Sequence, residues 1–342
     1  MKVLFFASRK PPIQGQLGQK RGFLRIYPPH GCVLASLRAG FSLFPPTWGK
    51  VVPDGWAIIL PMKANFPLTT WRLILSNPLP GKMNMAIDAA ILAAVGKEEV
   101  PPTLRLYRWD PPCISLGYSQ NYNDVNEEEL MSRGWDVVRR PTGGRAILHT
   151  DELTYAVIGP KTDPRLEGGL MDSYQQLSLA LSKALTELGL PVEIHSGKNP
   201  LAHHQPVCFE NPSDFEITVE GKKIIGSAQA RKKEGILQHG SLPLRGDLTR
   251  ITAALQYKSP EERTNAGQTL LQKAATIAST LGKEISWEQA ARAFEYGFST
   301  VLNLDLRKGS LTPNEEKYAR QLAADQFGNP AWTRGSTLNK QD

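Results

Sequence analysis

Residues 214–244 read DFEITVEGKKIIGSAQARKKEGILQHGSLPL and form an all-β stretch. Apolar and polar residues alternate in short runs, which turn signals at Glu220-Gly221 and Glu234-Gly235 interrupt. Alternation indicates strands with one face against a core, and an acidic residue followed by glycine favours a tight hairpin. Because hairpins pair their strands antiparallel, this stretch predicts the antiparallel part of a sheet.

Helical and strand patterns precede this stretch from Trp71 onward. Asn126 can cap the helix that follows it, Asp172 is expected to open a helix, and Gly189 is expected to close that helix. The patterns predict helices over 83–96, 127–134 and 173–189, and strands over 103–109, 113–117, 136–140, 145–149 and 153–159.

The final third of the chain is helical in pattern. Ser286 with Gln289 and Thr312 with Glu315 fit capping boxes, and Pro313 falls at the first helical position. The fold class expected is α/β (α+β), a mixed, largely antiparallel sheet flanked by helices. We divide the chain into a basic extension (1–65), a catalytic domain (70–255) and a helical C-terminal portion packed on it (256–342).

The positive charge of the chain is confined to its N-terminal segment. Eight of the 40 Lys and Arg residues, but only one of the 33 acidic residues, precede Met62, so the remainder is neutral. A neutral body argues against nucleic-acid binding. Residues 1–61 have three interpretations: a targeting segment, an unstructured extension, or sequence upstream of a true start at Met62. No apolar run is long enough for a membrane span.

The glycine pair Gly143-Gly144 lies between two strand patterns, just after Arg139-Arg140. Paired glycines allow backbone with positive φ, as in a tight turn, or allow a ligand to approach the backbone closely. These residues alone leave both interpretations open.

The three cysteines are too few and too scattered for a disulfide framework, which favours a reducing compartment. Cys32 lies in the extension, and Cys113 has the setting of a buried thiol. Cys208 lies in an irregular, proline-flanked stretch, where a thiol is either inert or exposed and reactive. A nearby cation would favour its thiolate; candidates are Lys222, Lys223, His203 and His204.

The candidate lysines and histidines also have interpretations without a catalytic role. Lys222 and Lys223 also fit an exposed hairpin pair, and His203 and His204 are candidate metal ligands without a second pair at useful spacing. His149 and His239 are single histidines near strands, a setting typical of structural groups. The sequence predicts no metal site.

Several motifs together resemble the biotin/lipoate A/B protein ligase family: NMAIDAAIL, SLGYSQ, RRPTGGRAILHTDELTY, CF, KIIGSAQARKKEGILQHGSL and NPAW. The resemblance runs from about Trp71 to Thr333, with the motifs in the family's order. Within the family, ILHTDELTY is similar to the cysteine-dependent octanoyltransferases. The extension before residue 62 has no counterpart in the family core, and Ala156 stands where the family often has serine.

The resemblance implies the site. It assigns Cys208 as the nucleophile that carries the acyl group, and Lys223 as the residue that lowers the pKa of that cysteine and transfers protons. The substrate-binding residues that it implies are Arg139, Arg140, Thr142, Gly143, Gly144, Arg145, His149, Gly226, Ser227 and Ala228.

The reaction that the resemblance implies is octanoyl transfer from octanoyl-acyl carrier protein to a lysine of a lipoyl domain, in protein lipoylation. The acceptors would be the glycine cleavage H protein or E2 subunits, no ATP or other cofactor would be required, and the location would be cytoplasmic. One alternative is an ATP-dependent lipoate-protein ligase, which would not need Cys208. Another is a non-catalytic acyl-binding or lipoyl-domain-binding protein. The sequence does not specify the preferred acceptor, the chain-length selectivity or the oligomeric state.

Overall fold

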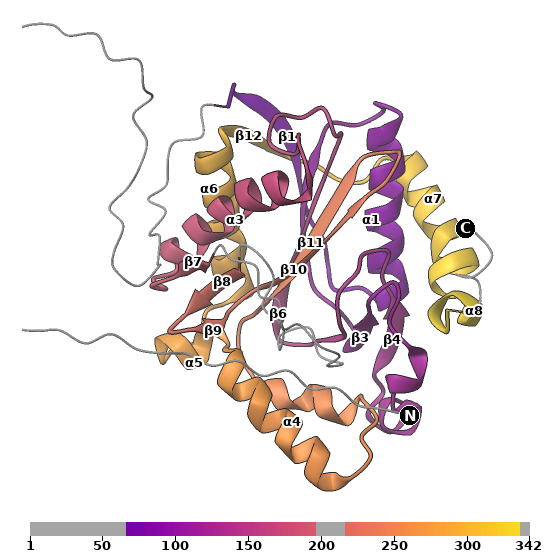
Figure 1. Cartoon of the computed structure of the whole chain (residues 1–342). Coiled ribbons are helices and arrows are strands. Elements are labelled where there is room, and N and C mark those ends of the chain that lie inside the picture. Colours follow the sequence, from indigo (N-terminus) through magenta and orange to yellow (C-terminus); the bar gives the residue numbers. More distant parts are fainter. Residues whose placement is uncertain (1–65, 196–215, 336–342) are drawn as a thin grey trace, which may run out of the picture. The chain divides into compact units, whose positions relative to one another are not determined.

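The computed structural model describes residues 66–195 and 216–335 (Figure 1). A six-stranded sheet forms its centre, in the order β10-β11-β6-β2-β1-β12. The pairs among β10, β11, β6 and β2 are antiparallel, whereas β1 pairs parallel with both β2 and β12. This mixed, largely antiparallel sheet confirms the predicted fold class. Its strands are β1 (Thr69–Leu75), β2 (Thr103–Tyr107), β6 (Glu152–Gly159), β10 (Gly226–Arg231), β11 (Ile236–Pro243) and β12 (Leu304–Lys308).

Two three-stranded sheets accompany the central sheet. In one, β3 (Cys113–Leu116) lies between β4 (Asp136–Arg139), parallel to it, and β5 (Ile147–His149), antiparallel to it. In the other, β8 (Glu216–Val219) lies between β7 (Glu193–His195) and β9 (Lys222–Lys223), and both pairs are antiparallel.

Helices cover both faces of the central sheet (Figure 1). Strand β6 shows the division, because its side chains alternate between two hydrophobic clusters. Leu153, Tyr155 and Val157 pack with α3 (Leu170–Glu187) and α6 (Trp287–Leu302). Ala156 and Ile158 pack with α1 (Gly81–Gly96) and α7 (Pro313–Leu322). Every residue of β6 is therefore buried.

Shorter helices complete the fold. A third hydrophobic cluster joins β3 and β5 to several of them. The shorter helices of the fold are η1 (Tyr122–Asp124), α2 (Glu127–Arg133), η3 (Leu248–Ala253), α4 (Pro260–Lys273), α5 (Ile277–Leu281), the π-helical turn η4 (Ala323–Phe327) and α8 (Pro330–Thr333). None of the helices in the described ranges is long and apolar enough to cross a membrane.

Most predicted helix ends are confirmed by their caps. The Asn126 side chain accepts a hydrogen bond from Glu129 N at 3.2 Å, and both capping boxes, at Ser286 and Thr312, are formed. The predicted start of α3 at Asp172 is wrong. The helix begins at Leu170, and Asp172 lies in its first turn, where its carboxylate accepts from Gly169 N at 2.7 Å. An acid at the third helical position caps from inside the helix, so the predicted helix start at residue 173 is three residues late.

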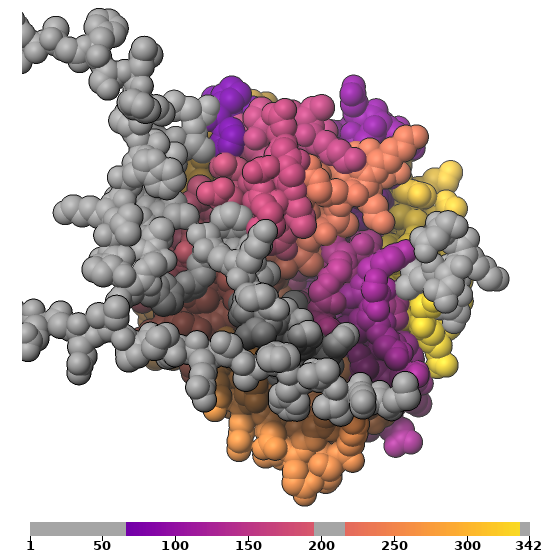
Figure 2. Space-filling model, in the orientation of Figure 1, coloured from indigo at the N-terminus to yellow at the C-terminus, as the bar shows by residue number. Residues whose placement is uncertain are grey.

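The predicted hairpin turns are also found. Glu220 and Gly221 both have positive φ, 51° and 73°, between β8 and β9. Residues 232–235 form the tip of the β10–β11 hairpin, which reaches the surface between α3 and the C-terminal helices in Figure 2. Residues 256–335 contribute β12 to the central sheet and α6 and α7 to its two faces, so they share its core. The domain boundary at residue 255 stays a prediction, and the 1–65 extension lies outside the described residues.

Candidate active site

A pocket of about 340 Å³ opens between the central sheet and the β3–β5 sheet. The surface exposed in the pocket is mostly apolar, although half of its lining residues carry polar side chains, a combination that suits a small-molecule site. The lining residues are Met85, Tyr107, Trp109, Ser115, Arg140, Ile147, His149, Thr154, Gly226, Ser227, Ala228, His239, Gly240 and Ser241. Five of them are among the predicted substrate-binding residues: Arg140, His149, Gly226, Ser227 and Ala228.

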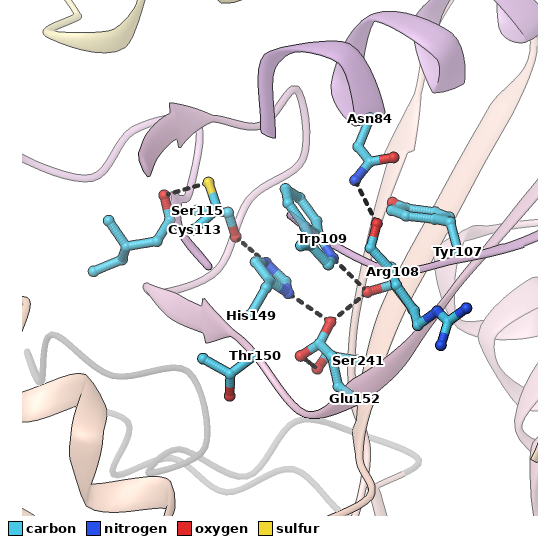
Figure 3. A network of polar contacts seen from close by, with 12 residues as sticks. Asn84, Tyr107, Arg108, Trp109, Cys113, Ser115, His149, Thr150, Glu152 and Ser241 are labelled. Atoms are coloured by element: carbon cyan, nitrogen blue, oxygen red, sulfur yellow. Dashed lines mark hydrogen bonds and ion pairs between the residues drawn. The ribbon is translucent and has the colours of Figure 1, made fainter. Parts of the chain in front are cut away.

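His149 connects two strands at one wall of this pocket (Figure 3). Its Nε2 lies 2.7 Å from Ser115 Oγ, and its Nδ1 lies 2.7 Å from Glu152 Oε1. Its ring stacks on Trp109 with the centroids 3.9 Å apart. Both ring nitrogens are thus occupied, which fixes the ring in place, as expected for a structural histidine.

The Glu152 carboxylate contacts two hydroxyl groups in addition to His149. Thr154 donates to Oε1 and Ser241 donates to Oε2, while the Trp109 indole N–H donates to Thr154 Oγ1 at 2.7 Å. Burial alone would raise the pKa of Glu152, but His149 and the hydroxyl donors lower it below its ordinary value. Glu152 is therefore a buried, ionised anchor that fixes one wall of the pocket.

Asp88 anchors the other side of the pocket from helix α1. Arg105 Nη1 donates to its carboxylate at 2.7 Å and Tyr107 OH at 3.0 Å, and all three side chains are fully buried. Burial acts to raise the pKa of Asp88, but Arg105 and His239 lower it overall. His239 Nδ1 lies 3.5 Å from this carboxylate, outside hydrogen-bond geometry, and its Nε2 lies 2.6 Å from Thr142 Oγ1. Burial lowers the pKa of His239, so the ring is neutral at pH 7.

The glycine loop is built around Arg140. The guanidinium donates to the carbonyls of Gly143 and Arg145 at 2.8 and 2.7 Å, and also to Ser115 O at 2.8 Å. Gly144 has φ +91°, a conformation that glycine adopts without strain, so the tight-turn interpretation holds for this residue. Gly143 is exposed, and a Cβ placed there would meet nothing within 4 Å. Neither glycine lines the pocket described above.

Arg139 lies away from the pocket. Its Nη1 donates to the carbonyls of Gly117, Tyr118 and Gln120 at 2.7–2.9 Å, and its Nε donates to Thr333 O at 3.0 Å. The side chain is buried and connects the C-terminal helix α8 to the loop after β3. Its geometry is that of a structural residue.

Lys223 lies in a second, adjoining pocket of about 260 Å³. The two pockets share Ser227, whose hydroxyl lies 2.7 Å from Tyr155 OH. Burial raises the pKa of Tyr155 to about 12, so the phenol stays neutral. Lys223 Nζ lies 2.5 Å from Glu216 Oε1, and both side chains are almost completely buried. The interpretation of Lys222-Lys223 as an exposed pair is therefore wrong for Lys223, because β9 turns its side chain inward.

The cysteine assignments are only partly covered by the structure. Cys113 is fully buried, and burial raises the pKa of its thiol well above the usual range, as expected for an inert cysteine. Cys208, His203 and His204 lie outside the described residues. Within the described part of the chain, no group of three His, Cys, Asp or Glu side chains is arranged to hold a metal ion.

Sequence reasoning missed several residues of this site. Asp88, Ser115 and Glu152 were not candidates, although two of them carry a recognisable signal. Asp88 is the only charged residue in the apolar helix MNMAIDAAILAAVG after Lys82, and Glu152 begins an otherwise apolar strand. A lone acid in an apolar element is buried with a partner, and such pairs gather at functional sites.

An apolar pocket bounded by two buried carboxylate networks, with a buried lysine in the adjoining pocket, suits an enzyme that binds an acyl chain. The chain matches the lipoyl protein ligase A/B catalytic domain over residues 80–299. The chain belongs to this family.

Relatives and solved structures agree with this assignment. An octanoyltransferase LipM from Symbiobacterium thermophilum is 40% identical over 272 residues, 77% of this chain and 98% of the relative. That of Bacillus subtilis is 35% identical over 273 residues, 77% of this chain and 97% of the relative. A bi-partite lipoate protein ligase from Thermoplasma acidophilum has the same fold (TM-score 0.65, 24% identity, 78% of this chain and 97% of that one). A lipoate-protein ligase A bound with ATP gives TM-score 0.65 at 25% identity, over 78% of this chain and 99% of that one.

Proposed function

We propose that this protein is an octanoyltransferase that moves an octanoyl group from acyl carrier protein to a lysine of a lipoyl domain. The observation that carries the proposal is the apolar pocket that meets the Lys223 pocket at Ser227. An eight-carbon chain gains about 0.8 kcal/mol for each CH₂ it buries, several kcal/mol in all, before the costs of binding. The pocket would hold this chain and present its thioester carbonyl toward Lys223.

Two steps complete the proposed reaction. Cys208, as the thiolate, attacks the thioester of octanoyl-acyl carrier protein, which breaks the C–S bond to the carrier and leaves an octanoyl-enzyme. The ε-amine of the acceptor lysine then attacks this new thioester, forms the amide and releases Cys208. Lys223 stabilises the thiolate as an ammonium and exchanges protons with the leaving thiol and the incoming amine.

The loop residues have a positional role in this proposal. The open space beside Gly143 leaves room for the thioester end of the substrate. Arg140 holds the loop in place, with Arg145 supplying one carbonyl, while Thr142 ties the loop to His239. Thioester exchange is nearly isoenergetic and amide formation is favourable, so we expect the reaction to need no ATP. Because thiols are kept reduced in the cytosol, we expect a cytoplasmic location.

An ATP-dependent lipoate-protein ligase is the competing function, since ligases share the fold. A ligase would activate the acid as an adenylate and would have no use for an acyl-carrying cysteine. The cysteine at position 208 of the sequence therefore favours the transferase. The acceptors we propose are lipoyl-domain proteins, such as the glycine cleavage H protein or E2 subunits.

Intact-protein mass spectrometry tests the proposal. The enzyme is mixed with octanoyl-acyl carrier protein without ATP, beside Cys208→Ala and, as a matched control, Cys113→Ala. We expect one octanoyl group on the wild type and on Cys113→Ala, none on Cys208→Ala, and discharge when a lipoyl domain is added. Modification of the lipoyl domain only when free acid and ATP are supplied would replace the transferase with the ligase.

A further inference from the structure

The ion pair of Lys223 with Glu216 follows from the register of the β8–β9 hairpin. Thr218 pairs with Lys223, so these two side chains project from the same face. Glu216 lies two residues before Thr218 on β8 and therefore shares that face. The diagonal separation suits two long side chains, and Lys223 Nζ lies 2.5 Å from Glu216 Oε1.

The lysine is also held from its backbone. Ala275 N donates to Lys223 O at 3.1 Å, and Lys223 forms a β-bridge with Ala274 after helix α4. The exposed fractions of the Lys223 and Glu216 side chains are 7% and 10%. Glu216 Oε1 is buried and makes no hydrogen bond within the described residues, and its contact with Lys223 is an ion pair.

The ion pair of Lys223 with Glu216 bears on a side reaction that would compete with the proposed transfer. The acceptor is a lysine ε-amine, and Lys223 carries the same group in a pocket that shares Ser227 with the acyl site. A neutral Lys223 amine would attack an octanoyl thioester. That step forms an amide C–N bond, breaks the C–S bond, releases a thiolate and frees one proton from the nitrogen. The product amide is stable, so the enzyme would be blocked permanently.

We propose that Glu216 is a positioning residue that returns Lys223 to an ion-paired ammonium after each proton exchange and so prevents the enzyme from octanoylating its own lysine. An ammonium has no free electron pair with which to attack. Removing the Glu216 carboxylate takes this counter-charge away from the buried lysine, and burial favours the neutral amine. This inference rests on the proposed function, because it requires an octanoyl thioester at the site.

The test compares Glu216→Gln with Glu220→Gln, which makes the same change in the exposed turn of the same hairpin. Each protein is incubated with octanoyl-acyl carrier protein, treated with hydroxylamine, which cleaves thioesters and spares amides, and then mass-analysed and peptide-mapped. In Glu216→Gln we expect a hydroxylamine-resistant octanoyl group on Lys223, formed about tenfold faster or more than in the wild type. Glu220→Gln should behave as the wild type does.

Three outcomes would overturn the inference. One is a Glu216→Gln enzyme that forms the thioester at the wild-type rate without any amide. Another is an amide on Lys222 in place of Lys223. The third is an adduct that persists in Glu216→Gln with Lys223→Arg. A wild type that forms no thioester would instead refute the proposed function, so the two failures are distinct.

A conservative variant guards against a folding defect in Glu216→Gln. Glu216→Asp keeps the charge but withdraws it by one methylene, so we expect an amide rate between those of the wild type and Glu216→Gln. Circular dichroism establishes that each variant is folded. If Glu216→Gln does not fold, a folded Glu216→Asp enzyme that forms no amide above the wild-type level refutes the inference.

Discussion

The buried pair of Asp88 and Arg105 offers a direct test of how the pocket is held. Both side chains are fully buried, with 2.7 Å between Arg105 Nη1 and Asp88 Oδ1. Asp88→Asn keeps the shape but removes the charge, and breaking a buried pair costs about 3–5 kcal/mol. Arg105 keeps its contacts with Asn84 Oδ1 at 2.7 Å and Ser76 Oγ at 3.0 Å. We therefore expect the lower end, about 3 kcal/mol, a large share of the roughly 5–15 kcal/mol typical of a domain.

Urea unfolding followed by circular dichroism measures this loss, provided that the slope of the transition is unchanged. Asp305→Asn is the control, because it removes a carboxylate from an exposed pair with Arg307, where little change is expected. A double-mutant cycle with Arg105→Met then isolates the coupling, since removing both charges leaves neither unpaired. A loss below about 1 kcal/mol for Asp88→Asn, or additive effects in the cycle, would refute the reasoning.

Three further perturbations test other parts of the site. Gly144→Ala should destabilise the fold by about 1–2 kcal/mol in urea unfolding, because its φ is +91°, whereas Gly143→Ala should be tolerated; equal losses would contradict the turn geometry. The folded-state pKa of His239 is below its ordinary 6.5, so the unfolded chain binds the proton first and the free energy of unfolding should fall as pH drops below that value. Unfolding at about pH 7.5 and 5.5 measures this, and an equal decline in His239→Gln would show that another group causes it. Ala228→Phe should fill the acyl pocket and favour butanoyl over octanoyl donors in competition assays; unchanged selectivity would place the chain elsewhere.

Local patterns predicted the elements of this fold well because their causes are local. Alternation marked the strands within residues 214–244, the capping boxes at Ser286 and Thr312 marked two helix starts, and an acidic residue followed by glycine marked the β8–β9 turn. Asp172 placed the helix start three residues late, because an acid serves a helix N-terminus both as the cap and from inside the first turn.

The partners of the site residues were beyond local reasoning. Whether Lys223 points outward or inward depends on the pairing of β8 with β9. It also depends on the packing of β8 against α3 and of β9 against α4. His149 is held by Ser115, which lies 34 positions earlier in the chain yet 2.7 Å away in space. The motifs therefore identified the region of the site, whereas the charged and hydrogen-bonded partners of its residues depend on how distant strands and helices pack.

The pairing of β1 with β12 has a consequence for the protein as it is synthesised. Thr70 and Asp305, which face each other there, lie 235 residues apart. At roughly 5–20 residues per second, β1 waits about 10–50 s for this partner to be made. Throughout that time one edge of β1 can pair with any other chain, since an uncovered strand edge is a template for aggregation. Misassembly is therefore expected mainly during translation, and conditions that slow synthesis of the last third should lower the yield of folded protein.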